Sequence, residues 1–98
     1  MSDSIDSLTI SYQDNGTETV RELDKQVLTR GAWTTIIFRY QDWEPAKNAW
    51  SPVRFSIRRY QKRNDQYWQK SKFNISSTEQ ARKIIDVLNQ WLEQEVPE

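Results

Sequence analysis

Cationic and aromatic side chains alternate along two consecutive segments in the second half of the chain, residues 53–61 and 66–75. Alternate residues of a strand point to opposite faces of a sheet. If the two segments pair with their apolar sides together, the other face gathers six cationic or aromatic groups. These are Arg54, Arg58, Tyr60, Trp68, Lys70 and Lys72. Cations neutralise phosphates and exposed rings stack on bases, so such a face suits a single-stranded nucleic acid.

Two further cations extend this candidate surface. Arg39 can join it from the preceding apolar segment, and Lys62 carries charge into the turn between the two segments. Like charges on adjacent strands repel one another, and an anionic ligand would offset that cost. The alternative is a solvated outer face on which Tyr60 and Trp68 pack against each other across the strands. The predicted nucleic-acid-binding residues are Arg39, Arg54, Arg58, Tyr60, Lys62, Trp68, Lys70 and Lys72.

The residue types that the chain lacks argue against catalysis. It has no histidine and no cysteine, which removes the commonest general base, the thiolate nucleophile and the usual zinc ligands. Only two glycines are present, so there is no glycine-rich phosphate loop. We therefore expect no enzymatic activity, no catalytic residues, no cofactor and no metal. No segment has the length and apolarity of a membrane span, and the expected compartment is the cytoplasm, with association with the nucleoid left open.

A net charge of zero conceals a segregation of charge along the chain. Residues 1–24 hold six acidic side chains and one basic, a net charge of −5. Residues 25–72 hold eleven basic and three acidic side chains (+8), and residues 73–98 hold five acidic and two basic (−3). A concentrated basic block attracts anionic partners through its local field. The acidic ends could instead pack over the basic middle, and the N-terminal one could compete there with nucleic acid.

The first third of the chain predicts a hairpin. Residues 8–12 alternate apolar and polar side chains, which is the period of a strand. Asn15 and Gly16 follow, a pair typical of a tight turn with positive φ angles. Residues 18–29 also fit a helical stripe, but the turn signal and the β-branched flanks favour a returning strand.

The middle of the chain predicts a central strand and a loop before the basic hairpin. Residues 33–40 are rich in β-branched and aromatic side chains and form the strand. Residues 41–52 contain two prolines and are predicted as a loop that carries Trp43 and Trp50. Residues 62–65 are the polar turn of the hairpin.

The end of the chain predicts a long amphipathic helix over residues 77–94. Ser76 with Glu79, and Ser77 with Gln80, both have the spacing of a capping box. The apolar stripe of this helix is expected to pack in the core, although its tryptophan could equally contact a second subunit because the core of so short a chain is small. The stripe consists of Ala81, Ile84, Ile85, Leu88, Trp91 and Leu92.

The order of these elements predicts one α+β domain over residues 1–98. The fold is expected to be an antiparallel meander sheet of four to five strands followed by one long C-terminal helix. Residues 33–75 form the main part of this sheet. Residues 1–30 are an N-terminal hairpin or acidic extension. We expect the molecule to be a homodimer.

Three runs of the sequence resemble the DNA-binding domain of the positive-cofactor-4-type transcriptional coactivators. They are Ile36-Ile37-Phe38-Arg39-Tyr40, Val53-Arg54-Phe55-Ser56-Ile57-Arg58-Arg59-Tyr60, and Lys72-Phe73-Asn74-Ile75-Ser76, the last leading into a helix. The resemblance covers about residues 33–92. The first thirty residues have no counterpart in it.

The resemblance implies a four-stranded antiparallel sheet and a helix, assembled as a homodimer whose helices take part in the subunit interface. It also implies binding of single-stranded or unwound DNA across the sheet surfaces. The positions that match the family's motif are Arg39, Arg58, Tyr60 and Lys72, with Lys70 nearby.

These observations predict a non-enzymatic, coactivator-like protein that binds single-stranded DNA. RNA stays open as a ligand, because nothing in the sequence reads a 2′-hydroxyl group. The alternative is a protein–protein interaction module of the same fold that binds no nucleic acid. Its contact surface would be the loop with Trp43 and Trp50, or Trp91 on the helix, because tryptophan is enriched in interface hot spots.

Overall fold

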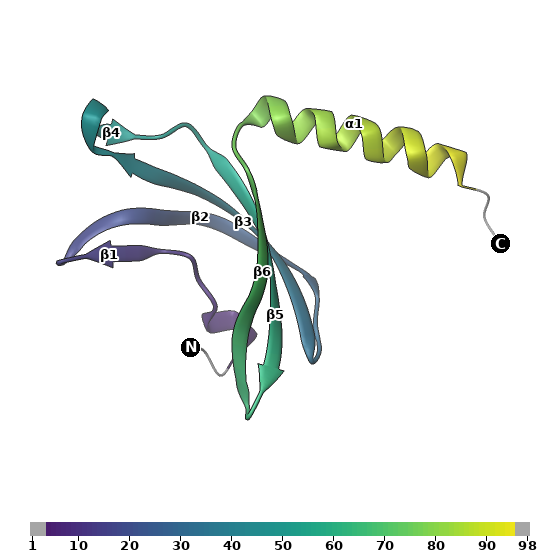
Figure 1. Cartoon of the computed structure of the whole chain (residues 1–98), viewed down its shortest axis with the longest axis horizontal. Coiled ribbons are helices and arrows are strands. Elements are labelled where there is room, and N and C mark those ends of the chain that lie inside the picture. The colour runs from purple at the N-terminus through teal and green to yellow at the C-terminus, as the bar shows by residue number, and fades with distance from the viewer. Residues whose placement is uncertain (1–3, 96–98) are drawn as a thin grey trace.

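The computed structural model describes residues 4–95, which form one antiparallel sheet and one helix (Figure 1). The strands are β1 (Tyr12–Asp14), β2 (Thr17–Thr29), β3 (Trp33–Glu44), β4 (Ala49–Trp50), β5 (Arg54–Arg63) and β6 (Gln66–Ile75). They lie in the order β1-β2-β3-β5-β6, and the short β4 pairs with the end of β3. Helix α1 (Thr78–Gln94) follows the sheet, and two short 3-10 turns are η1 (Ile5–Ser7) and η2 (Pro45–Lys47). The predicted α+β fold and its order of elements are confirmed.

The prediction of a strand over residues 8–12 was wrong except at its last residue. Tyr12 begins β1, whereas Leu8 and Ile10 lie in a segment outside the sheet and are buried against it. The side chain of Lys25 donates hydrogen bonds to three backbone carbonyls of this N-terminal segment. The Lys25 side chain thus satisfies carbonyls that, in a strand, would accept hydrogen bonds from the backbone N–H groups of the neighbouring strand.

The loop predicted over residues 41–52 is shorter than expected. Strand β3 continues to Glu44, and its Trp43 pairs with Trp50 of β4. The reversal between them is made by Pro45, which begins η2, and by Asn48 at a φ of 50°. Asparagine adopts this left-handed conformation more readily than most residues do, so the reversal is compact and the two tryptophans meet.

Both predicted hairpin turns are present. Asn15 and Gly16 have φ angles of 52° and 80°, and Asn64 and Asp65 have φ angles of 53° and 61°. Two successive positive φ angles match the twist of the flanking strands. These turns fix the pairing of β1 with β2 and of β5 with β6.

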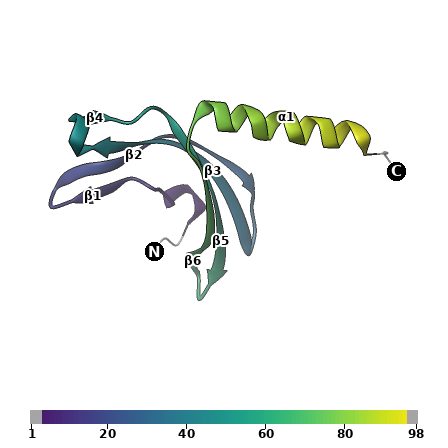
Figure 2. The same ribbon diagram turned by 45° about the horizontal axis from the view of Figure 1, so that its top comes forward.

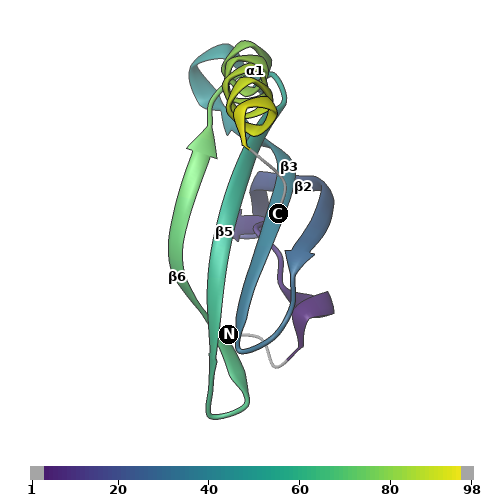
Figure 3. The same ribbon diagram turned by 90° about the vertical axis from the view of Figure 1, so that its right-hand side faces the viewer.

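The core lies on one face of the curved sheet. We call the face that carries Phe38 the inner face and the face that carries Ile37 the outer face. Phe38 is fully buried, and the N-terminal segment lies against it inside the curve of the sheet (Figures 1 and 3). The buried cluster consists of Leu8, Ile10, Ile36, Phe38, Tyr40, Tyr60 and Tyr67. Residues that the sequence assigned to the extension therefore complete the core.

Helix α1 begins as predicted but does not pack as predicted. Ser77 is the N-cap, and its hydroxyl accepts a hydrogen bond from the backbone N–H of Gln80 at 3.0 Å. The helix then leads away from the sheet (Figures 1 and 2). Its stripe was expected in the core, but Trp91 is 60% exposed and Leu92 is 66% exposed. No helix within residues 4–95 is long and apolar enough to cross a membrane.

Candidate nucleic-acid interface

The β5–β6 hairpin brings part of the predicted cationic set together on the inner face. Arg58 of β5 pairs directly with Lys72 of β6, and the next inner positions are Ser56 opposite Asn74. Arg54 and Tyr60 occupy the same face of β5, because they pair with the inner residues of β3. Four predicted residues, Arg54, Arg58, Tyr60 and Lys72, thus share one face.

Trp68 does not share that face, and its predicted placement was wrong. The register of β5 and β6 shifts at a bulge, so that Arg59 pairs with Ser71 but Tyr60 pairs with Gln69. Lys70 is the extra residue in this bulge. An extra residue reverses the alternation beyond it, which places Trp68 on the outer face and Tyr67 in the inner core.

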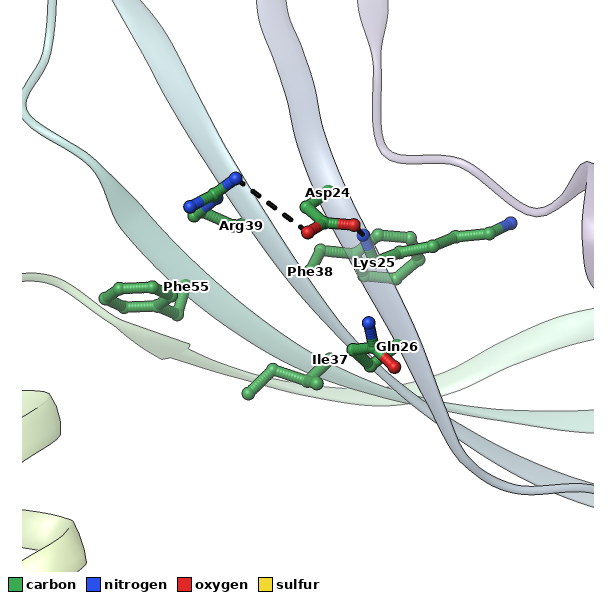
Figure 4. A pocket seen from close by; sticks show the side chains of 7 residues that line it. All are labelled: Asp24, Lys25, Gln26, Ile37, Phe38, Arg39 and Phe55. Atoms are coloured by element: carbon green, nitrogen blue, oxygen red, sulfur yellow. Dashed lines mark hydrogen bonds and ion pairs between the residues drawn. The ribbon is translucent and has the colours of Figure 1, made fainter.

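Arg39 also lies on the outer face, contrary to the prediction. It pairs with Phe55, whereas Tyr40 pairs with Arg54, so Tyr40 and not Arg39 shares the face of the predicted cations. Figure 4 shows Arg39 over a shallow hollow, beside Asp24 and on the same side as Phe55. The Arg39 and Asp24 side chains approach to 3.8 Å, and both are more than half exposed. This weak surface pair contributes little to stability.

Two inner-face residues of the predicted set serve the fold rather than a ligand. Tyr60 is buried in the core, so its ring is not exposed for stacking on a base. Burial raises the pKa of its phenol above the ordinary value, while Arg58 opposes the rise and Glu22 adds to it. Arg54 is held by two carboxylates, Asp42 at 2.9 Å and Glu44 at 3.5 Å, and its charge is largely balanced.

A hydrogen-bond chain holds the polar groups at the centre of the inner face. The Nε–H of Arg58 donates to the hydroxyl of Ser56 at 3.1 Å, and that hydroxyl donates to Oδ1 of Asn74 at 2.6 Å. A second bond runs from Nη1 of Arg58 to Oε1 of Gln69 at 3.1 Å. Ser56 is fully buried, so its hydroxyl is protected from water, whereas Asn74 is exposed. These bonds do not use Nη2 of Arg58 or the amide NH₂ of Asn74, so both groups stay available as donors beside Lys72.

The hairpin is strongly basic and poorly compensated. Residues 54–75 hold seven basic side chains and one acidic. Among residues 4–95, Arg54 is the only one of the seven that takes part in an ion pair. The remaining like charges repel across the strands, which costs stability unless a counter-charge is present.

The tip of the hairpin forms a second group of cationic and aromatic side chains. The ammonium group of Lys62 lies 5.8 Å from the centre of the Tyr67 ring. Trp68 is 40% exposed and lines one hollow together with Lys70 and Arg63. These groups lie at the end of the hairpin and on both of its faces instead of beside Arg58. Of the two rings, Tyr67 is buried and only Trp68 is exposed.

The acidic N-terminal residues do not neutralise this surface. Within the described part of the chain, one ion pair joins residues 1–24 to the basic middle, that of Asp24 with Arg39. The N-terminal segment is held against the sheet mainly by its buried Leu8 and Ile10. Apart from the pair of Asp24 with Arg39, the described acidic residues at the start of the chain form no ion pairs with the basic block, so the alternative in which they neutralise it is not supported.

The outer face carries several apolar side chains that are only partly covered. Phe73 is 54% exposed, and Trp33 is exposed with the guanidinium of Arg59 over its ring at 4.2 Å. The sequence predicted this face as the core, because it carries Phe55 and Ile57. The core formed on the other face because the N-terminal segment packs there.

The two tryptophans of the region predicted as a loop also pack together. Trp43 and Trp50 meet edge to face with ring centres 5.4 Å apart, and Arg21 lies over the Trp50 ring at 4.1 Å. Such contacts stabilise this corner of the sheet.

Comparison of the chain with family models, with curated proteins and with solved structures found no match.

Proposed function

We propose that this chain is a non-enzymatic, coactivator-like protein that binds single-stranded DNA along its β5–β6 hairpin and acts as a homodimer. The observation that carries the proposal is the direct pairing of Arg58 with Lys72, two cations with no acidic partner among residues 4–95. A phosphate chain would supply the missing counter-charge. RNA offers the same phosphates and stays an alternative ligand, and the proposed compartment is the cytoplasm, with the nucleoid as the place where the DNA ligand lies.

The exposed aromatic side chains favour single strands over duplexes. Trp68 lies at the hairpin tip beside Lys70, and a splayed base can stack on such a ring. Duplex DNA hides the faces of its bases and is read by a helix or ribbon in its major groove. The only α-helix of the described residues carries three acidic and two basic side chains beside its apolar stripe, so it offers no concentrated basic face to a duplex.

The homodimer rests on two apolar surfaces that are left largely exposed by the rest of residues 4–95. One is the stripe of α1, and the other is the outer face around Phe73 and Trp33. The radius of gyration is 15.9 Å, compared with about 13 Å for a compact domain of 100 residues. Most of the stability of a helix in a protein comes from the packing of its apolar face, and α1 leaves most of its apolar stripe exposed. A second copy offers both surfaces the partners they lack.

The first experiment is a tryptophan-fluorescence titration of the protein with an oligo-dT of about 20 nucleotides at two salt concentrations. We expect saturable quenching at low salt and much weaker binding at high salt. The variant Lys70→Ala/Lys72→Ala should bind more weakly, with a salt slope shallower by about one for each phosphate that the protein no longer neutralises. A matched control, Lys47→Ala/Lys83→Ala, removes the same charge from η2 and α1 and should behave like the wild type.

Absence of quenching by a folded protein at low salt would contradict the proposal. Binding would then be sought in a protein partner, because the exposed Trp91 also suits a protein–protein interface. Equal weakening in both double variants would mean that the hairpin lysines have no special role.

A further inference from the structure

The inner face carries a cleft with two walls, and the second wall is the N-terminal segment. One wall is made by Arg58, Lys72 and Asn74 of the hairpin. The other is made by Thr9, Ile10, Ser11 and Tyr12, and Tyr40 and Val20 lie between the walls. Sequence patterns did not connect these walls, because they are more than forty residues apart in the chain.

Hydrogen bonds fasten the second wall to strand β2. Lys25 donates from its ammonium group to the carbonyl of Leu8 at 2.7 Å and to that of Asp6 at 2.9 Å. The backbone N–H of Glu22 donates to the hydroxyl of Ser11 at 2.9 Å, and the hydroxyl of Thr9 donates to the Glu22 carboxylate at 2.7 Å. The wall is therefore positioned before any ligand arrives.

The two walls carry complementary chemistry. Tyr12 pairs with Val20 in the sheet and is 60% exposed, so its ring is open at the rim of the cleft. Across from it stand the free donors of Arg58, Asn74 and Lys72, which suit the oxygens of a phosphate. The one carboxylate that lines the cleft, Asp42, is bound to Arg54 at 2.9 Å and is therefore balanced.

We propose that this cleft is a nucleotide subsite, in which Tyr12 stacks on one base of the strand while the attached phosphate binds Arg58 and Lys72. The subsite rests on the proposed binding of single strands and adds to it a defined place for a base. Tyr12 has no role in the fold that explains its position, because its ring is exposed on a strand of three residues. In this proposal Tyr12 takes the base-stacking role that the sequence predicted for Tyr60, whose ring is buried.

The test compares two fluorescent 20-mers in anisotropy titrations, one of dT and one of abasic sites with the same phosphates. We expect Tyr12→Leu to weaken dT binding about 5-fold or more, since stacking on a base is worth about 1–3 kcal/mol. Its binding to the abasic strand should be unchanged, and Tyr12→Phe should match the wild type. Gln13→Leu, which changes the neighbouring exposed residue of β1 and leaves the lining of the cleft intact, is the matched control.

The outcomes separate the two proposals. If the wild type binds neither strand, both proposals fail. If the wild type binds dT and Tyr12→Leu binds it equally well, the subsite alone is overturned. A 5-iodouracil strand provides a second measurement that needs no variant: on irradiation we expect crosslinks to the peptide that contains Tyr12, and crosslinks confined to other peptides would overturn the subsite.

Discussion

Ser56 is the residue that decides where the donors of the cleft point. Its buried hydroxyl accepts from Arg58 and donates to Asn74. Replacing it with alanine leaves both partners without their hydrogen bond. We expect Ser56→Ala to lower the free energy of unfolding by about 1–3 kcal/mol and to weaken oligo-dT binding, as measured by urea unfolding and by anisotropy. Ser71→Ala, on the exposed β6, should stay within about 0.5 kcal/mol of the wild type, and equal stability of both variants would contradict a structural role for the chain of bonds.

Tyr60 gives a pH dependence with a definite sign. Burial raises the pKa of its phenol above the ordinary value of 10.0, so the folded state holds the proton more tightly than the unfolded state. The resulting stability is fully present below pH 10 and is lost as the pH rises through the raised folded pKa. Tyr60→Phe has no such proton. We therefore expect the wild type to lose stability relative to Tyr60→Phe above about pH 10. Urea unfolding of both proteins at about pH 8 and about pH 11 measures this loss. An equal change in the free energy of unfolding of the two proteins between these pH values would contradict this account.

At the scale of elements, the sequence predicts types and turns well and predicts faces poorly. The β6 boundaries and the Ser77 cap follow from local propensity and capping, which act within a few residues. Which face a side chain occupies depends on register, and a shift of one residue reverses it. The bulge at Lys70 has no signature in the sequence, so the predicted face of Trp68 was wrong. The error at Arg39 has the same cause, since its partner in β5 is set by tertiary packing.

Helix α1 should be sensitive to a charge placed in its apolar stripe. If the stripe packs against a second copy, such a charge should break the dimer. We expect Leu88→Glu to sediment as a monomer and to lose helical signal in circular dichroism, because the released helix loses the packing of its apolar face. Gln90→Glu adds the same charge on the polar side of α1 and should remain a dimer. A wild-type protein that sediments as a monomer would refute the dimer.

For the whole molecule, the shape explains why the core and the candidate site share one face. A single sheet can bury only one face with its own chain, and here the N-terminal segment covers the inner face through Leu8 and Ile10. The same segment forms the second wall of the cleft. Removing residues 1–24 would therefore remove core side chains, β1 and part of β2, and would test folding instead of competition by acidic residues. Side chains of the outer face and of the helix stripe, such as Phe73 and Trp91, stay more than half exposed.

A dimer with one basic hairpin in each protomer should respond to the length of the strand. A strand that reaches both hairpins makes its second contact within the complex, at a high effective concentration. We expect the affinity for oligo-dT to rise by roughly 10²-fold or more over a narrow range of lengths, beyond the gradual gain from additional equivalent sites. Leu88→Glu should abolish this step but keep the affinity of the wild type for strands too short to bridge, whereas Gln90→Glu should keep both. If the affinity rises gradually with strand length and identically in all three proteins, each protomer binds alone. Avidity requires two linked sites, and only the dimer links them.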